Sequence, residues 1–267
     1  MAKKRDPIRL EVLRGEWLTP ALRRLVLGGE EFARFVPNGF TDAYVKLRFG
    51  TEEAPEMRTY TVREIDEDAG EMVIDFVVHG SAGLAGPWAR DAAPGDQITM
   101  LGPGGAYSPD PDADWHLLVG DESALPAIAA AVEALPAGAV GQVIVEVDSA
   151  DHQLDLPVPD GVDLTWLHRS TAEPAARDPQ DAAATIAADT PLARAVRSAP
   201  WPEGQPHVFV HGEAHTVMRG IRPYIRSERG VPADRASISG YWRRGLDHQD
   251  FSAWKSEFKK VDDKVSA

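Results

Sequence analysis

The sequence of 267 residues contains no cysteine. Structural disulfides, thiolate zinc sites, cysteine-ligated iron–sulfur clusters and a cysteine nucleophile are therefore excluded. No apolar run reaches the roughly 18 residues of a membrane-spanning helix, so we expect no membrane insertion. The first stretch, MAKKRDPIRLEVL, is basic but lacks the apolar core of a signal peptide, which predicts a cytoplasmic location.

Positive charge is also scarce: 28 Lys and Arg face 42 Asp and Glu, which gives a formal net charge of −14. A strongly acidic chain binds nucleic acid and anionic membranes poorly, so we expect no nucleic-acid partner. An anionic ligand would need a local basic patch that works against the overall field. The length fits two domains. Nothing in the sequence marks an oligomeric state, and a monomer is the simplest expectation.

The first 112 residues have the pattern of short strands separated by Gly- and Pro-containing turns. One short helix is expected near 84–91. This density of short strands predicts a six-stranded antiparallel barrel as a first domain, residues 1–112. Its expected strands are 8–17, 22–28, 43–49, 57–64, 71–79 and 96–101.

From Trp115 onward, apolar strands alternate with helical segments, which predicts a parallel sheet with crossover helices in a second domain, residues 113–267. The junction is expected at 107–114. Helices are predicted at 123–135 and 214–230 and, less regularly, near 179–198. The expected strands are 115–120, 141–149, 163–169, 207–213 and 236–242.

The C-terminal segment 251–261 carries an apolar stripe at helical spacing, made by Phe251, Trp254, Phe258 and Val261. Such a stripe is typical of a helix that packs over the sheet.

The stretch MRTYTVRE, residues 57–64, is unusual for a barrel strand. Alternation places Arg58, Tyr60 and Val62 on one face and Thr59, Thr61 and Arg63 on the other. A cation, a ring and a hydroxyl side by side can bind a phosphate, stack on a heterocycle and hydrogen-bond its polar edge. An ordinary strand with one face in solvent explains the same residues, and the stretch alone favours neither interpretation.

A glycine-rich turn follows the strand expected to end at His79 and leads into the short helix. Helix N-termini offer free N–H groups and a positive dipole end to anions. Gly83 and Gly86 would let a phosphate approach the backbone. A tight turn and a strand-end histidine with a satisfied hydrogen bond are the simpler alternative.

A third stretch, LLVGDESALPAI at 117–128, joins a strand to a helix, with Asp121 or Ser123 as the expected N-cap. Ligands of α/β sheets bind outside the carboxyl ends of the strands. The stretch is not a GxGxxG fingerprint, and Asp121 and Glu122 would repel a pyrophosphate. We therefore expect this helix to face a ribose and a nicotinamide.

Taken together, RTYT, HG…GPWA, GPGG, GDESALPAI, HGEA and SGYWRRG occur in the order seen in the siderophore-interacting proteins, which the chain resembles over roughly 8–260. Members of that family are FAD-dependent, NAD(P)H-using ferric-siderophore reductases with a ferredoxin-reductase-like fold. The resemblance therefore implies a flavin barrel followed by a nucleotide domain.

The resemblance also implies roles. Arg58 would pair with the flavin phosphates, Tyr60 would pack on the isoalloxazine and Thr61 would bond near its reactive nitrogen. His79 would flank the flavin, and the turn 83–89 would hold the pyrophosphate. No catalytic side chain and no metal ligand is assigned. The full expected cofactor-binding set is Arg58, Thr59, Tyr60, Thr61, Arg63, His79, Gly80, Gly83, Ala85, Gly86, Trp88, Ala89, Gly120, Asp121, Glu122, Ser123, Ala124, Glu213, Tyr241 and Trp242.

Two positions depart from the family pattern. Relatives often have Ser where this chain has Gly86, and often carry a basic residue where positions 129–131 are three alanines. The first change removes a hydroxyl from the expected phosphate site. The second weakens the case for a complete basic siderophore pocket.

The expected substrate is a ferric siderophore, an Fe(III) chelate that is often anionic. Lys46, Arg48, Arg243 and Arg244 are the candidate substrate-binding cations, although each is equally well explained as a solvated surface charge. A flavin reductase with another acceptor and a non-catalytic nucleotide-binding module are the alternative functions.

The nicotinamide donor is left open between NADH and NADPH. Glu146 and Asp148 could bond a ribose 2′-hydroxyl, whereas His168 and Arg169 could meet a 2′-phosphate.

Overall fold

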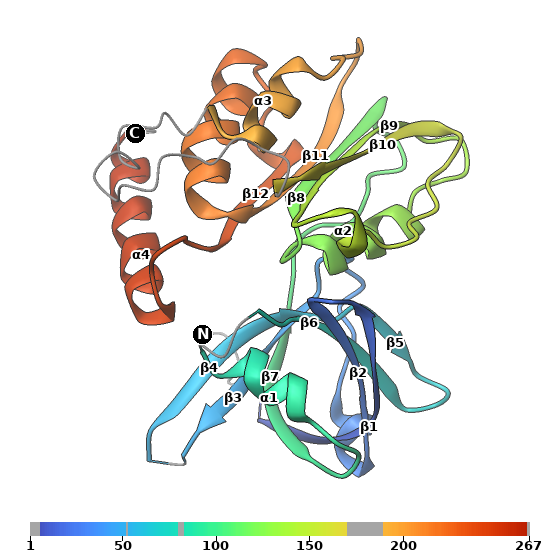
Figure 1. Cartoon of the computed structure of the whole chain (residues 1–267). Helices are drawn as coiled ribbons and strands as arrows, with labels where there is room; N and C mark the ends of the chain where they lie inside the picture. Colours follow the sequence, from blue (N-terminus) through green and yellow to red (C-terminus); the bar gives the residue numbers. More distant parts are fainter. Residues whose placement is uncertain (1–5, 52, 80–82, 170–188, 266–267) are drawn as a thin grey trace.

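A computed structural model of the chain describes residues 6–51, 53–79, 83–169 and 189–265. It contains two stacked halves, an antiparallel sheet below and a parallel sheet flanked by helices above (Figure 1). The change from one sheet to the other falls between Gly104 and Trp115, around the predicted junction. No helix in these residues combines the length and the apolar character that crossing a membrane requires.

The antiparallel sheet has seven strands in the described residues, ordered β4-β3-β7-β1-β2-β6-β5, not the six predicted. The additional strand is β5, which is only three residues long and pairs with β6. So short a segment has too little alternation to be recognised in the sequence. The strands are β1 (Ile8–Thr19), β2 (Leu22–Gly28), β3 (Tyr44–Gly50), β4 (Pro55–Thr61), β5 (Glu64–Asp66), β6 (Glu71–Val77) and β7 (Gln97–Gly104).

The sheet curves into a half-barrel, because its edge strand β4 packs against β6 near the opposite edge. The rings of Tyr60 on β4 and Phe76 on β6 lie 4.5 Å apart, and the N–H of Arg63 donates to the carbonyl of Val73. Helix α1 (Ala85–Asp91) covers the barrel and was correctly predicted. Its Trp88 ring lies 5.7 Å from that of Phe76, within the apolar core.

The upper half is a five-stranded parallel sheet, ordered β10-β9-β8-β11-β12, and every one of its strands was predicted. β8 is buried along its whole length because helices cover both faces of the sheet. The order reverses beside β8, where such sheets bind ligands. The strands are β8 (Trp115–Asp121), β9 (Val140–Val147), β10 (Gly161–His168), β11 (Pro206–Glu213) and β12 (Ala236–Trp242).

Helices α2 (Leu125–Glu133) and α3 (Pro191–Ser198) pack against this sheet, with two π-helical turns (Thr216–Ile221 and Tyr224–Glu228) in the segment predicted to be helical. The helix predicted near 179–198 is found only as α3, since 179–188 lie outside the described residues. Short 3₁₀ turns occupy Glu30–Arg34, Ala150–His152 and Ala233–Arg235.

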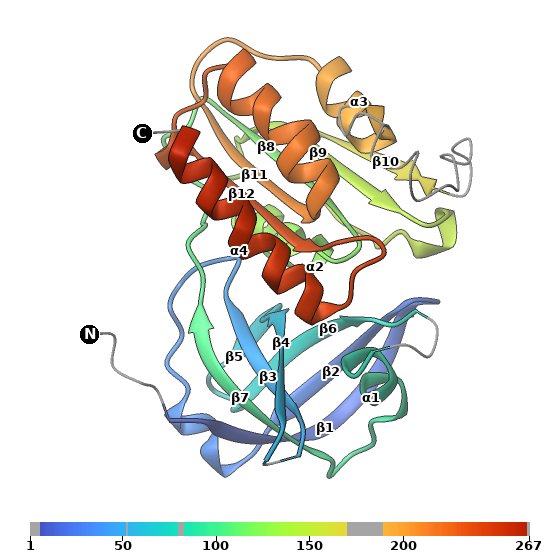
Figure 2. The ribbon, with the colours of Figure 1, turned by 90° about the vertical axis from the view of Figure 1, so that its left-hand side faces the viewer.

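The C-terminal helix α4 (His248–Val265) runs alongside the sheet (Figure 2). Its Phe251 is buried, and the Lys255 Nζ donates to the Gly240 carbonyl of β12 over 3.1 Å. The Arg219 guanidinium lies 4.7 Å from the ring centre of Phe258. The side chain of Val261 lies outside the described set. The helix therefore docks on β12 and its neighbouring helix, as its apolar stripe predicted.

The two halves meet along a seam that polar and aromatic side chains hold together. Asp42, just before β3, accepts hydrogen bonds from the N–H groups of Ala106 and Tyr107, each at 2.8 Å. The Tyr107 ring then stacks 4.7 Å from His207 of β11. These contacts fix the connecting segment between the sheets.

Candidate functional site

The stretch RTYT lies on β4, whose register with β3 places Arg58 opposite Leu47 and Tyr60 opposite Val45. Directly opposed residues share a face of the sheet. Val45 and Leu47 are fully buried, so Arg58 and Tyr60 point to the barrel side. Thr59 and Thr61 share the outer face with Lys46 and Tyr44. The predicted division of this strand into two faces is confirmed.

Arg58 is the cation of that inner face. Its Nη2 donates to Glu56 Oε2 over 2.8 Å and its Nη1 to the Met57 carbonyl over 3.1 Å. The side chain is 19% exposed, so the guanidinium reaches solvent at the barrel rim. A guanidinium has five N–H donors, which leaves several for an anionic ligand.

Tyr60 stays a neutral phenol. Burial raises its pKa to about 12, while the nearby positive charge of Arg58 acts in the opposite direction. Its ring therefore supplies a flat apolar surface beside a cation at every physiological pH.

Thr61 brings β4 close to the upper half, because its side chain lies near enough to Tyr241 on β12 to act on the pKa of that phenol, in the lowering direction. Burial raises the pKa of Tyr241, and the negative charge of Asp42 adds to this effect. The Tyr241 ring also lies 4.8 Å from His211 of β11. The seam thus places the end of the RTYT stretch against the carboxyl edge of the parallel sheet.

The turn before α1 offers exposed backbone. Gly83 has φ +83°, and a Cβ added there would meet no atom within 4 Å. At Gly86 an added Cβ would meet only ordinary contacts, the nearest being the Val77 carbonyl at 3.6 Å. A serine would fit this position, as in the resembling family. His79 is exposed at the start of the turn, and Gly80 lies outside the described residues.

Three members of the predicted set serve the core with their side chains. Ala85 and Ala89 are buried on the face of α1 that packs against the barrel, and Trp88 packs on Phe49 and Phe76. The side chains of Ala85 and Ala89 are therefore closed to a ligand, whereas that of Trp88 is only partly buried.

Asp121 ends β8 and ties the carboxyl edge of the sheet together. Its Oδ1 accepts hydrogen bonds from the N–H and the hydroxyl of Ser123, at 2.9 and 2.5 Å. Its Oδ2 accepts from the Glu213 N–H and the Trp242 Nε1, both at 2.8 Å. Burial raises the pKa of this carboxyl, and the donated hydrogen bonds act in the opposite direction.

The predicted N-cap of α2 is wrong. The cap position is Ala124, with no side-chain hydrogen bond, since the Asp121 carboxylate is engaged by Ser123, β11 and β12. Gly120 belongs to this crowded edge as well: a Cβ there would lie 2.6 Å from the Ala124 Cβ.

Arginines and carboxylates pair along the same edge. Glu213 Oε1 accepts from the Arg243 Nη1 over 2.9 Å and from the Arg244 N–H over 3.2 Å. Arg169 pairs with Glu122. Arg63, predicted to bind cofactor, spans the seam to Glu133 of α2, with Nη1 2.8 Å from Oε2.

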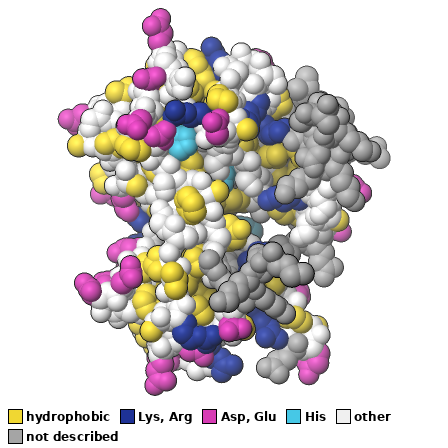
Figure 3. Space-filling model, turned by 180° about the vertical axis from the view of Figure 1, so that it is seen from behind, with side chains coloured by type: hydrophobic (Ala, Val, Ile, Leu, Met, Phe, Trp, Pro, Cys, Tyr) yellow, Lys and Arg dark blue, Asp and Glu magenta, His cyan; other side chains and the backbone are white. Residues whose placement is uncertain are grey.

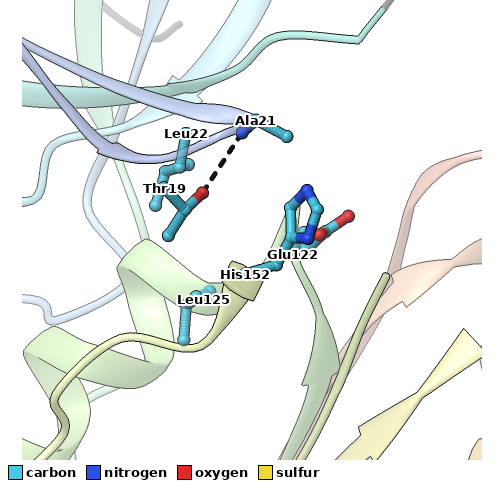
Figure 4. Close-up of a pocket in the computed structure, with 6 residues that line it drawn as sticks. All are labelled: Thr19, Ala21, Leu22, Glu122, Leu125 and His152. Atoms are coloured by element: carbon cyan, nitrogen blue, oxygen red, sulfur yellow. Dashed lines mark hydrogen bonds between the residues drawn. The ribbon is translucent and has the colours of Figure 1, made fainter. Parts of the chain in front are cut away.

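A recess also lies at the seam, between the β1–β2 turn and the upper half (Figure 4). It encloses no space large enough for a water molecule. The recess is therefore too small for a dinucleotide, and the surface hollowed between the two halves (Figure 3) is the better candidate. Its lining residues are Thr19, Ala21, Leu22, Glu122, Leu125 and His152.

Sequence reasoning missed Asp42, Tyr44 and His211, which surround the Thr61–Tyr241 contact. Each lies far from its partners along the chain. Asp42 and Tyr44 belong to no motif, and His211 begins the HGEA motif but was given no role.

A half-barrel followed by a parallel sheet of this order defines a ferredoxin-reductase-like protein. A ferredoxin NADP⁺ reductase of Neisseria gonorrhoeae, solved with FAD and NADP, shares this fold with a TM-score of 0.63 at 14% identity, over 88% of this chain and 99% of that one. A siderophore utilization protein of T. fusca has a TM-score of 0.76 at 34% identity, over 91% of this chain and 96% of that one.

Family models narrow the class. Residues 113–245 match the siderophore-interacting protein model, and 48–107 match the siderophore-interacting FAD-binding domain. An uncharacterized protein of Mycobacterium tuberculosis H37Rv is 46% identical, with 94% of this chain and 95% of that protein covered. The chain belongs to the siderophore-interacting protein family.

Two relatives have named activities. The ferric vibriobactin reductase ViuB of Vibrio cholerae is 32% identical, with 92% of each chain covered. An NADPH-dependent ferric-chelate reductase of Escherichia coli K12 is 36% identical over 59% of this chain and 70% of that protein.

The buried His211 predicts a pH dependence of stability. Burial lowers its pKa to about 3, and its Nδ1 is buried without a hydrogen-bond partner among the described residues. Between pH 6.5 and 5 His211 becomes protonated in the unfolded chain but stays neutral in the folded protein. Stability therefore falls as pH falls, by up to about 1.4 kcal/mol per pH unit from this group.

We expect His211→Gln to flatten the slope of unfolding free energy against pH in that window, measured by urea titration. The exposed His79→Gln is the matched control and should leave the slope intact. An unchanged slope in His211→Gln would show that the ring is solvated in the folded protein.

Proposed function

We propose that this protein is a cytoplasmic ferric-siderophore reductase, in which FAD connects NAD(P)H to an Fe(III) chelate. The observation that carries the proposal is the seam: the RTYT strand meets the carboxyl edge of the parallel sheet through the Thr61–Tyr241 contact. One electron carrier placed there would touch both halves. The names of the two reductase relatives support the same reaction class.

The residues present fit FAD. Arg58 offers free donors to phosphates, and Gly83 offers open backbone for their approach. The neutral ring of Tyr60 offers a surface for the flavin, and the Thr61 hydroxyl a hydrogen bond. When bound, FAD supplies the conversion between a hydride donor and an acceptor that takes one electron at a time.

The upper half would position the nicotinamide. Trp242 is 36% exposed, while its indole N–H is fixed on Asp121. Its ring can therefore contact a ligand without rotating freely. Glu213 is held by Arg243 and by the Thr216 N–H, so this carboxylate is likewise oriented before a ligand arrives. We propose Tyr241, Trp242 and Glu213 as the wall that the nicotinamide meets.

The Fe(III) chelate is the substrate, and no protein ligand to iron is needed, because reduction itself weakens the grip of oxygen donors on iron. Lys46 and Arg244 are exposed and could steer an anionic chelate. Arg243 contributes less, since Glu213 neutralises it. Arg48 lies on the same face of β3 as Lys46.

The structure limits how much positive charge the three alanines at 129–131 can have removed from this site. Ala129 and Ala131 are buried in α2, and only Ala130 is partly exposed. A basic residue could therefore be presented at position 130 alone, so the departure from the family removes at most one charge.

An anaerobic titration tests the function. We expect purified protein to be yellow, NADH or NADPH to bleach the 450 nm region, and a ferric siderophore to restore it with Fe(II) release. Bleaching without recovery by ferric siderophore, but with recovery by another acceptor, would indicate a flavin reductase of different substrate. Colourless protein that FAD does not reconstitute would indicate a non-catalytic nucleotide-binding module.

Arg58→Ala should weaken FAD binding about ten- to a hundredfold, since a hydrogen bond to a charged group contributes roughly 1.5–3 kcal/mol. Fluorescence titration of the flavin-free protein measures the dissociation constant.

Arg14→Ala is the matched control, because Arg14 also pairs with a glutamate of the barrel, Glu71, but lies on β1. FAD binding as tight in Arg58→Ala as in Arg14→Ala would exclude the role given to Arg58.

A further inference from the structure

Arg169, the first residue after β10, lies among three carboxylates at the carboxyl edge of the parallel sheet. Its Nη2 is 2.5 Å from Glu122 Oε2, its Nη1 is 4.0 Å from Glu146 Oε2, and its Nε is 3.9 Å from Asp148 Oδ1. Three negative charges thus surround one positive charge. Nothing in the described part of the chain groups His, Asp and Glu side chains as a metal site.

The backbone holds this group in place. β9 and β10 pair in parallel with Glu146 opposite Leu167, which carries Arg169 to the level of Asp148. Glu122 Oε1 accepts a hydrogen bond from the Asp148 N–H over 3.2 Å. Glu122 and Glu146 are each 15% exposed and Arg169 is 24% exposed, so these side chains have little freedom to separate.

In dinucleotide-binding sheets, this end of the second strand contacts the adenosine ribose. A carboxylate at the end of the strand next to the first one accepts hydrogen bonds from the adenosine ribose, whereas a 2′-phosphate requires an available cation. Here β9 neighbours β8, and Glu146 and Asp148 stand at its end. Among the described residues, Arg169 and Arg244 are the arginines whose charges act on Glu146, and Arg169 is already matched by more than its own charge.

We infer that this chain discriminates against NADPH and uses NADH, with Glu146 and Asp148 receiving the ribose 2′-hydroxyl. This inference rests on the proposed function, because it specifies the donor of the same site. A 2′-phosphate would meet three carboxylates and could reach Arg169 only by competing with Glu122. The preference would thus differ from that in the name of the E. coli relative.

Binding of two ligands that cannot transfer a hydride tests the inference. Isothermal titration of the FAD-saturated full chain would compare ADP-ribose with 2′-phospho-ADP-ribose. We expect ADP-ribose to bind at least about tenfold more tightly, from charge repulsion at this range. Added salt should narrow the difference, since screening acts over about 10 Å at 0.1 M.

Two neutral variants should change the ratio of the two affinities. Glu122→Gln and Asp148→Asn each remove one negative charge near Arg169 while keeping the side-chain shape, and each should bring the two dissociation constants closer by about threefold or more. Asp163→Asn is the control, because Asp163 is an exposed aspartate of β10 at the opposite end of the strand. The ratio of the two dissociation constants in Asp163→Asn should equal that in the unmodified protein.

The outcomes separate the claims. Equal or tighter binding of 2′-phospho-ADP-ribose, lost selectively in Arg169→Ala, would overturn the inference and leave the reductase proposal standing with NADPH as donor. Failure of both ligands to bind the FAD-saturated protein would overturn the dinucleotide site itself, and the inference with it. Tighter ADP-ribose binding that Arg169→Ala does not weaken supports it.

Discussion

The site depends first on one buried carboxylate, that of Asp121. It receives hydrogen bonds from Ser123, from the Glu213 N–H of β11 and from the Trp242 indole of β12. A buried charge without a cationic partner is stable only when donors surround it. This requirement brings the ends of three strands together, and it fixes the Trp242 ring and the adjacent Tyr241 at the seam.

The seam then determines what the two sheets can do together. Each sheet has its own apolar core, and Leu22 of β2 joins the apolar cluster beneath α2. The polar and aromatic contacts between the halves are Thr61 with Tyr241, Arg63 with Glu133, and Tyr107 with His207. These contacts leave the surface hollowed between the two halves (Figure 3). A ligand that spans both halves can enter there, which is the requirement for coupling a nicotinamide to a flavin.

Local patterns predicted much of this structure. Alternation on RTYT gave its two faces, and apolar runs gave all the strands of the parallel sheet. What they could not give depends on partners distant in the chain. Asp121 has the appearance of a helix cap in the sequence, but Glu213 and Trp242 engage it. The motif residues Ala85 and Trp88 face the core because α1 lies on the barrel, and β5 is too short for a visible period.

Asp121→Asn tests the central claim, because an amide group cannot accept all the hydrogen bonds that the carboxylate accepts. Stopped-flow measurement of flavin bleaching by NADH, on protein whose fold is checked by circular dichroism, gives the result. The account predicts that FAD still binds as in the unmodified protein, since β4 is untouched, while bleaching slows about tenfold or more, the effect of roughly 1.4 kcal/mol. Bleaching at the original rate in a folded, FAD-loaded variant would contradict it.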